Sequence, residues 1–483
     1  MTAALLVEDL HVADAKGTPL LRGASLQARP GVPLTVLGET GSGKSLVLLA
    51  VLGALPPGLQ AQGRVALAGT EMLVAPPQAR RRLWGRTVSV LPQEPFLALD
   101  PTMRALSQVA ETYRLVRGFP RPRAQAEAEA RLRELGLEGT GTRFPFQLSG
   151  GMAQRLALAI LRAADTPVLL ADEPTKGLDA PRRDEAARRL RDEAERGRAV
   201  VTVTHDVAVA RALGGDVLIL REGAVVEHGP AAQVLASPSH AYSRALLAAE
   251  PSRWTRPARP PSPSGPPVME AVALRKSLGG RPLLREVSLT LRPGELVAVL
   301  GSSGSGKTTL GDLLLGLMRT DGGEVRRLPG VAPWRFTKLW QDPPAAFVPH
   351  QRLRQGLDVL SRRHGIPFAR FGSGMERLGL APALLDRLPA EISGGELQRF
   401  ALLRALSLDP VFLFADEPTS RLDPLTQATV APMLREAARS KGAAVLLVTH
   451  DPDLADALAD RVLRLHEGRL ASAGCHPGGP LGL

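Results

Sequence analysis

The sequence predicts an α/β fold made of two similar units in tandem, each with a parallel β-sheet at its core. Three observations lead to this prediction. Four short motifs occur twice along the 483 residues, in the same order, and each second copy lies 244 to 263 residues after the first. Each half contains unbroken apolar runs, which are typical of strands buried on both faces of a parallel sheet. In each half, one of these runs leads into a glycine-rich loop and then into a helical pattern.

The apolar runs are the predicted core strands. They are short, rich in Val and Leu, and lack the alternation expected of a strand with one solvated face. Two further segments predict a strand, a tight Glu-Gly turn and a second strand, which gives each half an antiparallel part. The core strands are predicted at 33–37, 168–171, 200–203, 296–300, 411–415 and 444–448, and the strand–turn–strand segments at 217–226 and 462–470.

Helices are predicted directly after the two glycine-rich loops, over 45–55 and 308–318. Longer helical patterns occupy the middle of each half, and 123–137, rich in Ala, Arg, Glu and Leu, is the clearest of them. We therefore expect a helical subdomain inserted into each α/β core, at 102–164 in the first half and at about 350–407 in the second.

The sharpest boundary is the segment 251–267, which holds seven prolines in 17 residues. Such a composition predicts a stiff, extended linker without helix or sheet, able to span about 50 Å at ~3.1 Å per residue. The predicted domains are therefore 1–250 and 268–483, joined by this linker.

Composition narrows the class of protein. No apolar run approaches the ~20 residues of a membrane-spanning helix, and the first residues carry no basic leader, so we expect neither a spanning segment nor a signal peptide. The single cysteine, Cys475, excludes an internal disulfide and a cysteine-built metal site, and a reducing cytoplasm is expected. The net charge of +12 suits nucleic acid or a membrane surface, but 53 of the 60 basic residues are arginines spread along the chain. We interpret them as solvated helix faces.

The glycine-rich loops have the pattern G-x-x-x-x-G-K-[ST], at 38–45 and 301–308. Glycines allow consecutive backbone N–H groups to curl around phosphate oxygens, and the helix that follows adds its positive end. Lysine reaches the β- and γ-phosphates of a nucleotide, and the hydroxyl after it holds Mg²⁺. The predicted phosphate ligands are Gly38, Gly41, Gly43, Lys44 and Ser45 in the first loop, and Gly301, Gly304, Gly306, Lys307 and Thr308 in the second; Ser45 and Thr308 also hold the metal.

Paired acids follow an apolar strand in each half, as Asp172-Glu173 and Asp416-Glu417. A carboxylate at the end of such a strand can hold Mg²⁺, so Asp172 and Asp416 are predicted metal ligands. The glutamate that follows could orient or deprotonate the attacking water, which makes Glu173 and Glu417 the predicted catalytic residues.

The next strand of each half ends in Thr-His-Asp, and His205 and His450 are placed to touch a γ-phosphate. Ser-Gly-Gly opens a helix in each half, at 149–151 and 393–395, and its N–H groups suit an anion. Because each half already supplies ligands for its own γ-phosphate, these donors are predicted to serve the nucleotide of the other half. The residues concerned are Ser149, Gly150, Gly151, Ser393, Gly394 and Gly395.

At these motifs the chain resembles two ATP-binding cassette (ABC) ATPase domains, a group of P-loop NTPases, fused in tandem. The likeness covers nearly everything outside the linker and the termini. It implies two ATP molecules sandwiched between head-to-tail domains, with Lys44 facing Ser393 and Lys307 facing Ser149. The resemblance also assigns motif residues that the chemistry alone does not: the Q-loop glutamines Gln93 and Gln341, ligands of nucleotide and Mg²⁺, and the D-loop aspartates Asp179 and Asp423.

A finer likeness concerns 93–101 and 237–247, which resemble segments of the ATPases of peptide and nickel importers; the second half lacks the tail segment. This implies an energy-coupling subunit, peripheral on the cytoplasmic face of the cell membrane, that imports peptides, nickel or metal chelates. Its expected partners are integral-membrane permease subunits and an extracytoplasmic substrate-binding protein. The cargo and the direction of transport stay open.

Two alternatives remain. A tandem ABC ATPase acting on ribosomes would suit the positive charge, but the short Pro-rich linker argues against it, and nucleic acid is not an expected partner. A scaffold that does not hydrolyse ATP would keep its biological activity without Glu173 and Glu417.

Overall fold

The computed structural model describes residues 4–256, 265–302, 304–420 and 422–472. The chain divides into two compact units, Met1–Leu247 and Ala248–Leu483. Residues 257–264 of the predicted linker and Cys475 lie outside the described residues.

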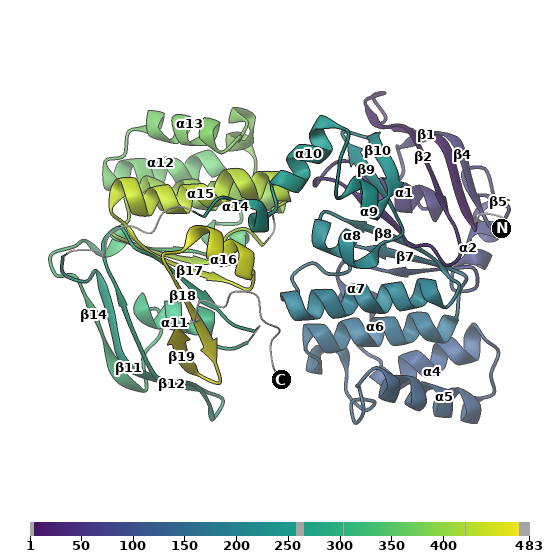
Figure 1. The fold of residues 1–483 in the computed structure, drawn as a ribbon, viewed down its shortest axis with the longest axis horizontal. Helices are drawn as coiled ribbons and strands as arrows, with labels where there is room; N and C mark the ends of the chain where they lie inside the picture. The colour runs from purple at the N-terminus through teal and green to yellow at the C-terminus, as the bar shows by residue number, and fades with distance from the viewer. Residues whose placement is uncertain (1–3, 257–264, 303, 421, 473–483) are drawn as a thin grey trace. The chain divides into compact units, whose positions relative to one another are not determined.

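Unit 1 is built on a six-stranded sheet of order β10-β9-β3-β8-β7-β6. Figure 1 labels four of its strands, β7 to β10. Five strands run parallel, and only β10 pairs antiparallel, with β9. The carboxyl ends of the parallel strands therefore meet at one edge, where the motif loops emerge. The strands are β3 (Leu34–Leu37), β6 (Val88–Leu91), β7 (Val168–Asp172), β8 (Ala199–Thr204), β9 (Asp216–Arg221) and β10 (Ala224–Pro230).

Both faces of this sheet are buried, which explains the unbroken apolar runs. In β7, Leu169 and Ala171 pack with the helices on one face, while Val168 and Leu170 pack with α1 and the second sheet on the other. The second sheet is antiparallel, of order β2-β1-β4-β5. The strands are β1 (Leu5–Ala13), β2 (Pro19–Ala28), β4 (Gln60–Leu67) and β5 (Thr70–Glu71); the helices are α1 (Lys44–Val51), α2 (Pro77–Leu83), α3 (Pro95–Ala98), α4 (Ala105–Leu115), α5 (Arg121–Glu134), α6 (Gly150–Ala164), α7 (Ala180–Glu195), α8 (Val207–Leu213), α9 (Ala231–Val234) and α10 (Ala241–Ala248).

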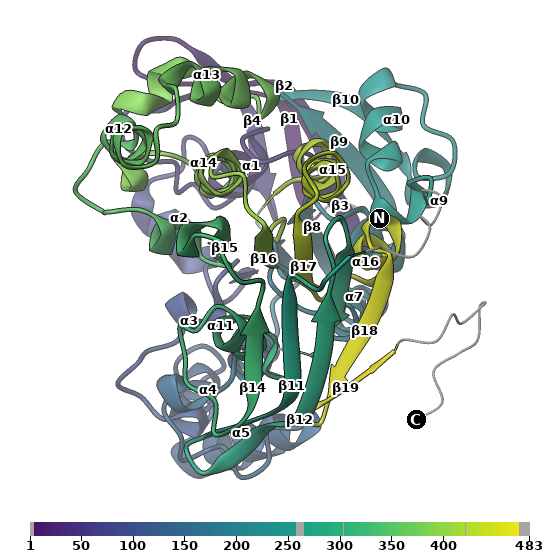
Figure 2. The ribbon, with the colours of Figure 1, turned by 90° about the vertical axis from the view of Figure 1, so that its left-hand side faces the viewer.

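Unit 2 repeats this plan. Its main sheet has the order β15-β16-β17-β13-β18-β19, and a smaller antiparallel sheet has the order β12-β11-β14, which Figure 2 shows side by side. The strands are β11 (Met269–Leu278), β12 (Arg281–Leu291), β13 (Leu296–Leu300), β14 (Gly322–Arg327), β15 (Phe336–Leu339), β16 (Phe412–Asp416), β17 (Ala444–Thr449), β18 (Arg461–His466) and β19 (Arg469–Ser472); the helices are α11 (Lys307–Leu314), α12 (Leu353–His364), α13 (Phe368–Arg377), α14 (Gly394–Ser407), α15 (Pro424–Lys441) and α16 (Pro452–Leu458).

The predicted fold class is confirmed. The six core strands lie within one residue of their predicted bounds, and the inserted helical subdomains are α4–α6 and α12–α14. The Glu-Gly turns are also found: Glu222 and Glu467 have φ of 47°, and Gly223 and Gly468 have φ of 80° and 77°. Positive φ at both central residues gives the tight hairpin turn that matches strand twist.

The two helices after the glycine-rich loops are shorter than predicted. α1 ends at Val51 rather than 55, because Gly53 adopts a φ of 61° and the Ala54 N–H donates back to the Leu49 carbonyl at 2.8 Å. This left-handed glycine closes the helix end. Unit 2 repeats it with Gly316, whose φ is 68°.

The start of the predicted linker is not extended. Pro251–Arg253 forms a 3-10 turn, and the Trp254 indole N–H donates to the Ala249 carbonyl at 3.1 Å. Trp254 packs against the core of unit 2. Proline is compatible with the first position of a helical turn, and burial of the indole favours this conformation over an extended one. The domain bounds predicted from the linker otherwise stay a prediction.

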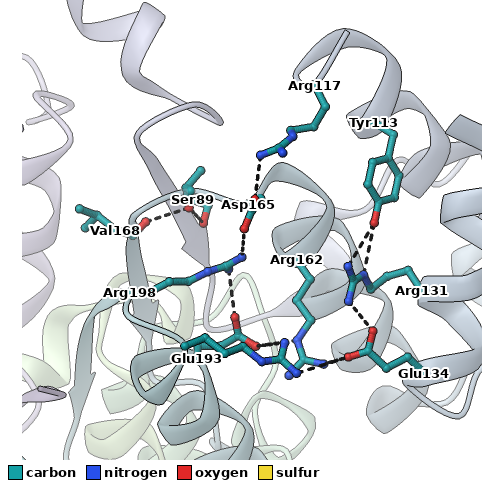
Figure 3. A network of polar contacts seen from close by, with 12 residues as sticks. Ser89, Tyr113, Arg117, Arg131, Glu134, Arg162, Asp165, Val168, Glu193 and Arg198 are labelled. Atoms are coloured by element: carbon teal, nitrogen blue, oxygen red, sulfur yellow. Dashed lines mark hydrogen bonds and ion pairs between the residues drawn. The ribbon is translucent and has the colours of Figure 1, made fainter. Parts of the chain in front are cut away.

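A chain of ion pairs joins the helical subdomain of unit 1 to its core (Figure 3). Arg162 on α6 contacts Glu134 on α5 at 2.7 Å and Glu193 on α7 at 2.6 Å, and both Arg162 and Glu193 are buried. Glu193 also contacts Arg198 at 3.0 Å, and Arg198 contacts Asp165 at 2.7 Å. A buried charge is tolerated only with a partner. These ion pairs therefore fix the position in which the helical subdomain packs against α7.

Candidate active sites

The glycine-rich loop of unit 1 emerges from β3 and leads into α1. Gly41 and Gly43 have φ of 84° and 100°, values that favour glycine. A Cβ on Gly38 would lie 2.2 Å from the Leu220 carbonyl oxygen, so no larger residue fits there. In unit 2 the corresponding Cβ on Gly301 would lie 2.7 Å from the Leu465 carbonyl oxygen. Gly304 and Gly306 likewise have positive φ, of 81° and 102°. Both loops therefore have the backbone curl that a phosphate requires.

Each loop lysine folds back over its own loop. Lys44 Nζ donates to the carbonyls of Gly38 at 2.8 Å and Glu39 at 2.6 Å. Lys307 Nζ donates to the carbonyls of Gly301 at 2.7 Å and Ser302 at 3.0 Å. Both lysine side chains are buried, and these hydrogen bonds hold each positive charge beside the loop, where a phosphate would bind.

The predicted metal ligands lie together in each unit. Ser45 Oγ is 3.5 Å from Asp172 Oδ1, and burial raises the pKa of Asp172. Asp416 is only 1% exposed, and neither of its carboxylate oxygens accepts a hydrogen bond from a described residue. Burial raises the pKa of Asp416 too, and the nearby Thr308 hydroxyl opposes the shift. A buried carboxylate with unsatisfied oxygens beside a hydroxyl fits a hard divalent cation.

Glu173 and Glu417 follow these aspartates in a strained conformation. Their φ values are 46° and 49°. Each N–H donates to the neighbouring strand, to the carbonyls of Val203 at 2.8 Å and Val448 at 2.9 Å. A non-glycine residue at positive φ costs about 1–3 kcal/mol and persists where surrounding contacts enforce it. The positive φ directs each glutamate side chain away from the strand and toward the histidine at the end of the next strand.

The glutamate and histidine form a pair in both units. Glu173 Oε1 is 2.9 Å from His205 Nδ1, and Glu417 Oε2 is 2.7 Å from His450 Nδ1. Burial would raise the pKa of Glu173, but the contacts with His205 and the charge of Lys44 outweigh it and lower the pKa. Burial would lower the pKa of His450, but the hydrogen bond to Glu417 outweighs it and raises the pKa. The structure therefore brings together, in unit 1, the predicted loop, acids and histidine.

The two Ser-Gly-Gly motifs begin α6 and α14, as predicted. Ser149 caps α6 by accepting from the Met152 N–H at 3.4 Å. Ser393 caps α14 by accepting from the Glu396 N–H at 3.3 Å, and its hydroxyl donates to Glu396 Oε2 at 2.7 Å. Both serines are exposed, and Gly150, Gly151, Gly394 and Gly395 form the first turns of these helices.

The remaining motif residues lie at loop and helix starts. Gln93 and Gln341 follow the edge strands β6 and β15, partly buried and exposed respectively. Asp179 and Asp423 cap α7 and α15, accepting from the backbone N–H groups of Arg182 at 3.2 Å and Thr426 at 3.0 Å.

One ion pair near the unit 2 site was not predicted. Lys338 Nζ on β15 contacts Asp312 on α11 at 2.5 Å, and both side chains are largely buried. The charge of Lys338 favours the ionised form of Asp416. The corresponding residues of the first half are apolar, Val90 and Leu49. The only sequence signal was a lysine between Phe336 and Leu339 in a short strand.

Comparisons with known proteins assign the family. A family model described as ABC transporter matches residues 21–176 and again 284–420. The peptidoglycan transport ATP-binding protein YejF of Agrobacterium fabrum is 32% identical, over 97% of this chain and 92% of the relative. This chain belongs to the ABC transporter family. The glutathione import ATP-binding protein GsiA of Escherichia coli K12 is 30% identical, over 97% of this chain and 86% of the relative.

Two matches of the ABC family model in one chain make it a tandem ABC ATPase, as the motif pairs predict. A solved structure described as a complex of archaeal ribosomal stalk protein aP1 and archaeal ribosome recycling factor aABCE1 aligns with a TM-score of 0.68, over 96% of this chain and 89% of that chain. Its identity is 21%, so the likeness concerns the fold alone. Among the described residues, no helix combines the length and apolar character needed to span a bilayer.

Proposed function

We propose that this tandem ABC ATPase powers an importer of small peptides or peptide-like molecules. The observation that carries the proposal is the similarity along 97% of the chain to relatives named for peptidoglycan transport and glutathione import. Glutathione is itself a short peptide. Nickel and metal chelates, which the sequence left open, gain no support from these relatives, and the peptide class is preferred.

The site geometry supports a specific role for each residue. Lys44 and Lys307, held at the loop mouths, would move onto the β- and γ-phosphates of ATP. Ser45 with Asp172, and Thr308 with Asp416, would hold Mg²⁺, which neutralises charge on the phosphates, and Gln93 and Gln341 would complete the two sites.

Glu173 and Glu417 would orient and deprotonate the attacking water. Their close contacts with His205 and His450 support this, because each histidine fixes the position of the carboxylate, and the contact with His205 lowers the pKa of Glu173. When it is protonated on both ring nitrogens, each histidine can also donate its Nε2–H toward the γ-phosphate.

We further propose that the two units pair head to tail, so that Ser149 and Ser393 each complete the nucleotide site of the other unit. Two features support this. Both serines are exposed at helix N-termini, which attract anions, and both units carry every catalytic residue. ATP binding would then close the pair, and hydrolysis would release it.

The proposed partners are permease subunits in the membrane and an extracytoplasmic binding protein, with the chain peripheral on the cytoplasmic face. The test is purification of the chain with the permeases encoded beside it, followed by ATP turnover in proteoliposomes. We expect a stable complex, with turnover stimulated by peptide and binding protein. Failure of the permeases both to bind and to stimulate, together with salt-sensitive sedimentation on ribosomes, would overturn the proposal.

A further inference from the structure

A tyrosine far along the chain contacts the phosphate loop of unit 1. The Tyr242 hydroxyl, on α10, accepts a hydrogen bond from the Glu39 N–H at 3.3 Å. Tyr242 is buried, with only 4% of its surface exposed, and the Arg221 guanidinium lies over its ring at 5.0 Å. The hydroxyl therefore meets the loop from inside the protein, at the residue directly after Gly38.

Tyr242 is held in place by the strand before it. Glu227 on β10 accepts hydrogen bonds from the Ser239 N–H at 2.7 Å, the Ser239 hydroxyl at 2.9 Å and the His240 N–H at 3.2 Å. His240 Nδ1 then accepts from the Tyr242 N–H at 3.1 Å. Burial would raise the pKa of Glu227, but hydrogen bonds from Ser243, Ser239 and His240 outweigh it and lower the pKa, so the carboxylate stays ionised and holds the turn.

The peptide groups of Glu39 are thus anchored on both sides. Its N–H is bound by Tyr242, and its carbonyl is bound by Lys44 at 2.6 Å. The hairpin that carries Glu227 supports the same loop, because the Gly223 N–H donates to the Ser42 carbonyl at 3.0 Å. When Lys44 leaves the Glu39 carbonyl for a phosphate, the Tyr242 hydroxyl still binds the Glu39 N–H, beside the Ser42 N–H that donates to the Glu39 carbonyl at 3.2 Å.

Unit 2 cannot make this contact. The chain contains two tyrosines, Tyr113 and Tyr242, and both belong to the first half. The second phosphate loop therefore lacks a tyrosine anchor from its own unit.

We propose that Tyr242 is a positioning residue for the phosphate loop of unit 1. It holds the loop in its phosphate-binding conformation before ATP arrives, so that the first site binds nucleotide more tightly than it would with a loose loop. The proposal rests on the assignment of 38–45 as a phosphate loop and is independent of the transported cargo.

The test is Tyr242→Phe in the full chain, with binding of a fluorescent N-methylanthraniloyl ATP followed by titration. Lys307→Ala isolates the first site, and Lys44→Ala isolates the second. In the Lys307→Ala background we expect the Kd to rise about two- to tenfold, the range for one lost hydrogen bond. In the Lys44→Ala background the Kd should not change. In steady-state ATP hydrolysis, Tyr242→Phe should raise KM and leave kcat within about twofold of the value before the substitution.

The matched control is Tyr113→Phe, which removes the other phenol hydroxyl of the chain, bound to Arg131 at 3.3 Å in the helical subdomain (Figure 3). It should leave both Kd values unchanged. Glu227→Gln, which loosens the turn before Tyr242 without touching the loop, should weaken the first site in the same direction. An unchanged Kd for Tyr242→Phe in the Lys307→Ala background, or equal losses at both sites, would overturn the proposal. Nucleotide binding needs no permease, so failure of the importer assignment would not produce either result.

Discussion

At the scale of single residues, the strained glutamates carry the most information about chemistry. Glu173 and Glu417 share a φ near 46–49° and a histidine partner, in two units built from different sequences. The motif order predicted which glutamates would act. The positive φ could not be predicted, because it is imposed by the hydrogen bond to the neighbouring strand rather than by the glutamate itself.

Replacing both glutamates, Glu173→Gln with Glu417→Gln, should abolish most turnover while leaving ATP binding intact. A general base contributes about 10²- to 10⁴-fold, so ATP hydrolysis should fall by that factor. The matched control is Glu222→Gln, because Glu222 also has positive φ but lies in the exposed turn between β9 and β10. Full turnover in the double variant would contradict the role assigned to the glutamates, and unchanged biological activity without turnover would support the scaffold alternative.

Asp165, at the end of α6, makes a prediction about pH. Burial would raise the pKa of Asp165, but the guanidinium groups of Arg198 and Arg117 outweigh it and lower the pKa. A carboxylate with a lowered pKa in the folded state contributes its full stabilisation at pH values above its pKa in the unfolded state, which is near 4. This contribution is lost as the pH falls through the pKa of the folded state.

Asp165→Asn should therefore destabilise unit 1 at pH 7, by under about 1 kcal/mol because the carboxylate is 56% exposed and screened. Asparagine tolerates the left-handed φ of 55° at this position, so the backbone stays unstrained. Urea unfolding should show the difference shrinking below pH 4. A difference that stays constant down to pH 3 would contradict the assigned role of the charge.

At the scale of elements, sequence periodicity predicted the strands and helical subdomains well, because both faces of the parallel sheets are buried. It overestimated α1 and α11, since the left-handed glycines Gly53 and Gly316 end helices whose apolar pattern continues. The prediction of an extended linker was wrong at Pro251, where burial of Trp254 favours a turn. A local left-handed glycine decided each helix end, and a tertiary contact of Trp254 decided the start of the linker.

The ion pairs between α6 and α7 predict a large effect of one side chain. Glu193→Ala removes the buried partner shared by Arg162 and Arg198, which keep Glu134 and Asp165 as their remaining partners. Breaking a buried ion pair by removing one member costs about 3–5 kcal/mol, and the remaining pairs should reduce this loss. The thermal unfolding midpoint of unit 1 should fall by several degrees. Glu195→Ala, on the same helix but in a surface pair with Arg191, should change stability by under about 0.5 kcal/mol. Equal losses of stability in the two variants would show that the buried ion pairs do not hold the helical subdomain against α7.

At the scale of the whole molecule, the duplicated motifs predicted the family, the two domains and the residues of each candidate site. The transported cargo could not be predicted, because no ATPase motif needs to touch it. The difference between the two sites was also missed. Lys338 faces the second site from a segment that the motif patterns do not cover. Tyr242 lies in the tail segment 237–247, whose likeness to importer ATPases did not predict a contact with the first phosphate loop.

The central claim is that each ATP is bound by both units, with the loop of unit 1 facing Ser393. The most direct measurement is disulfide cross-linking within one chain, after Cys475→Ser removes the single cysteine. Thr40→Cys paired with Ser393→Cys should cross-link rapidly in the presence of ATP when Glu173→Gln and Glu417→Gln prevent hydrolysis. Thr40→Cys paired with Ser149→Cys, within unit 1, should not. Cross-linking of the second pair in place of the first would contradict the head-to-tail arrangement.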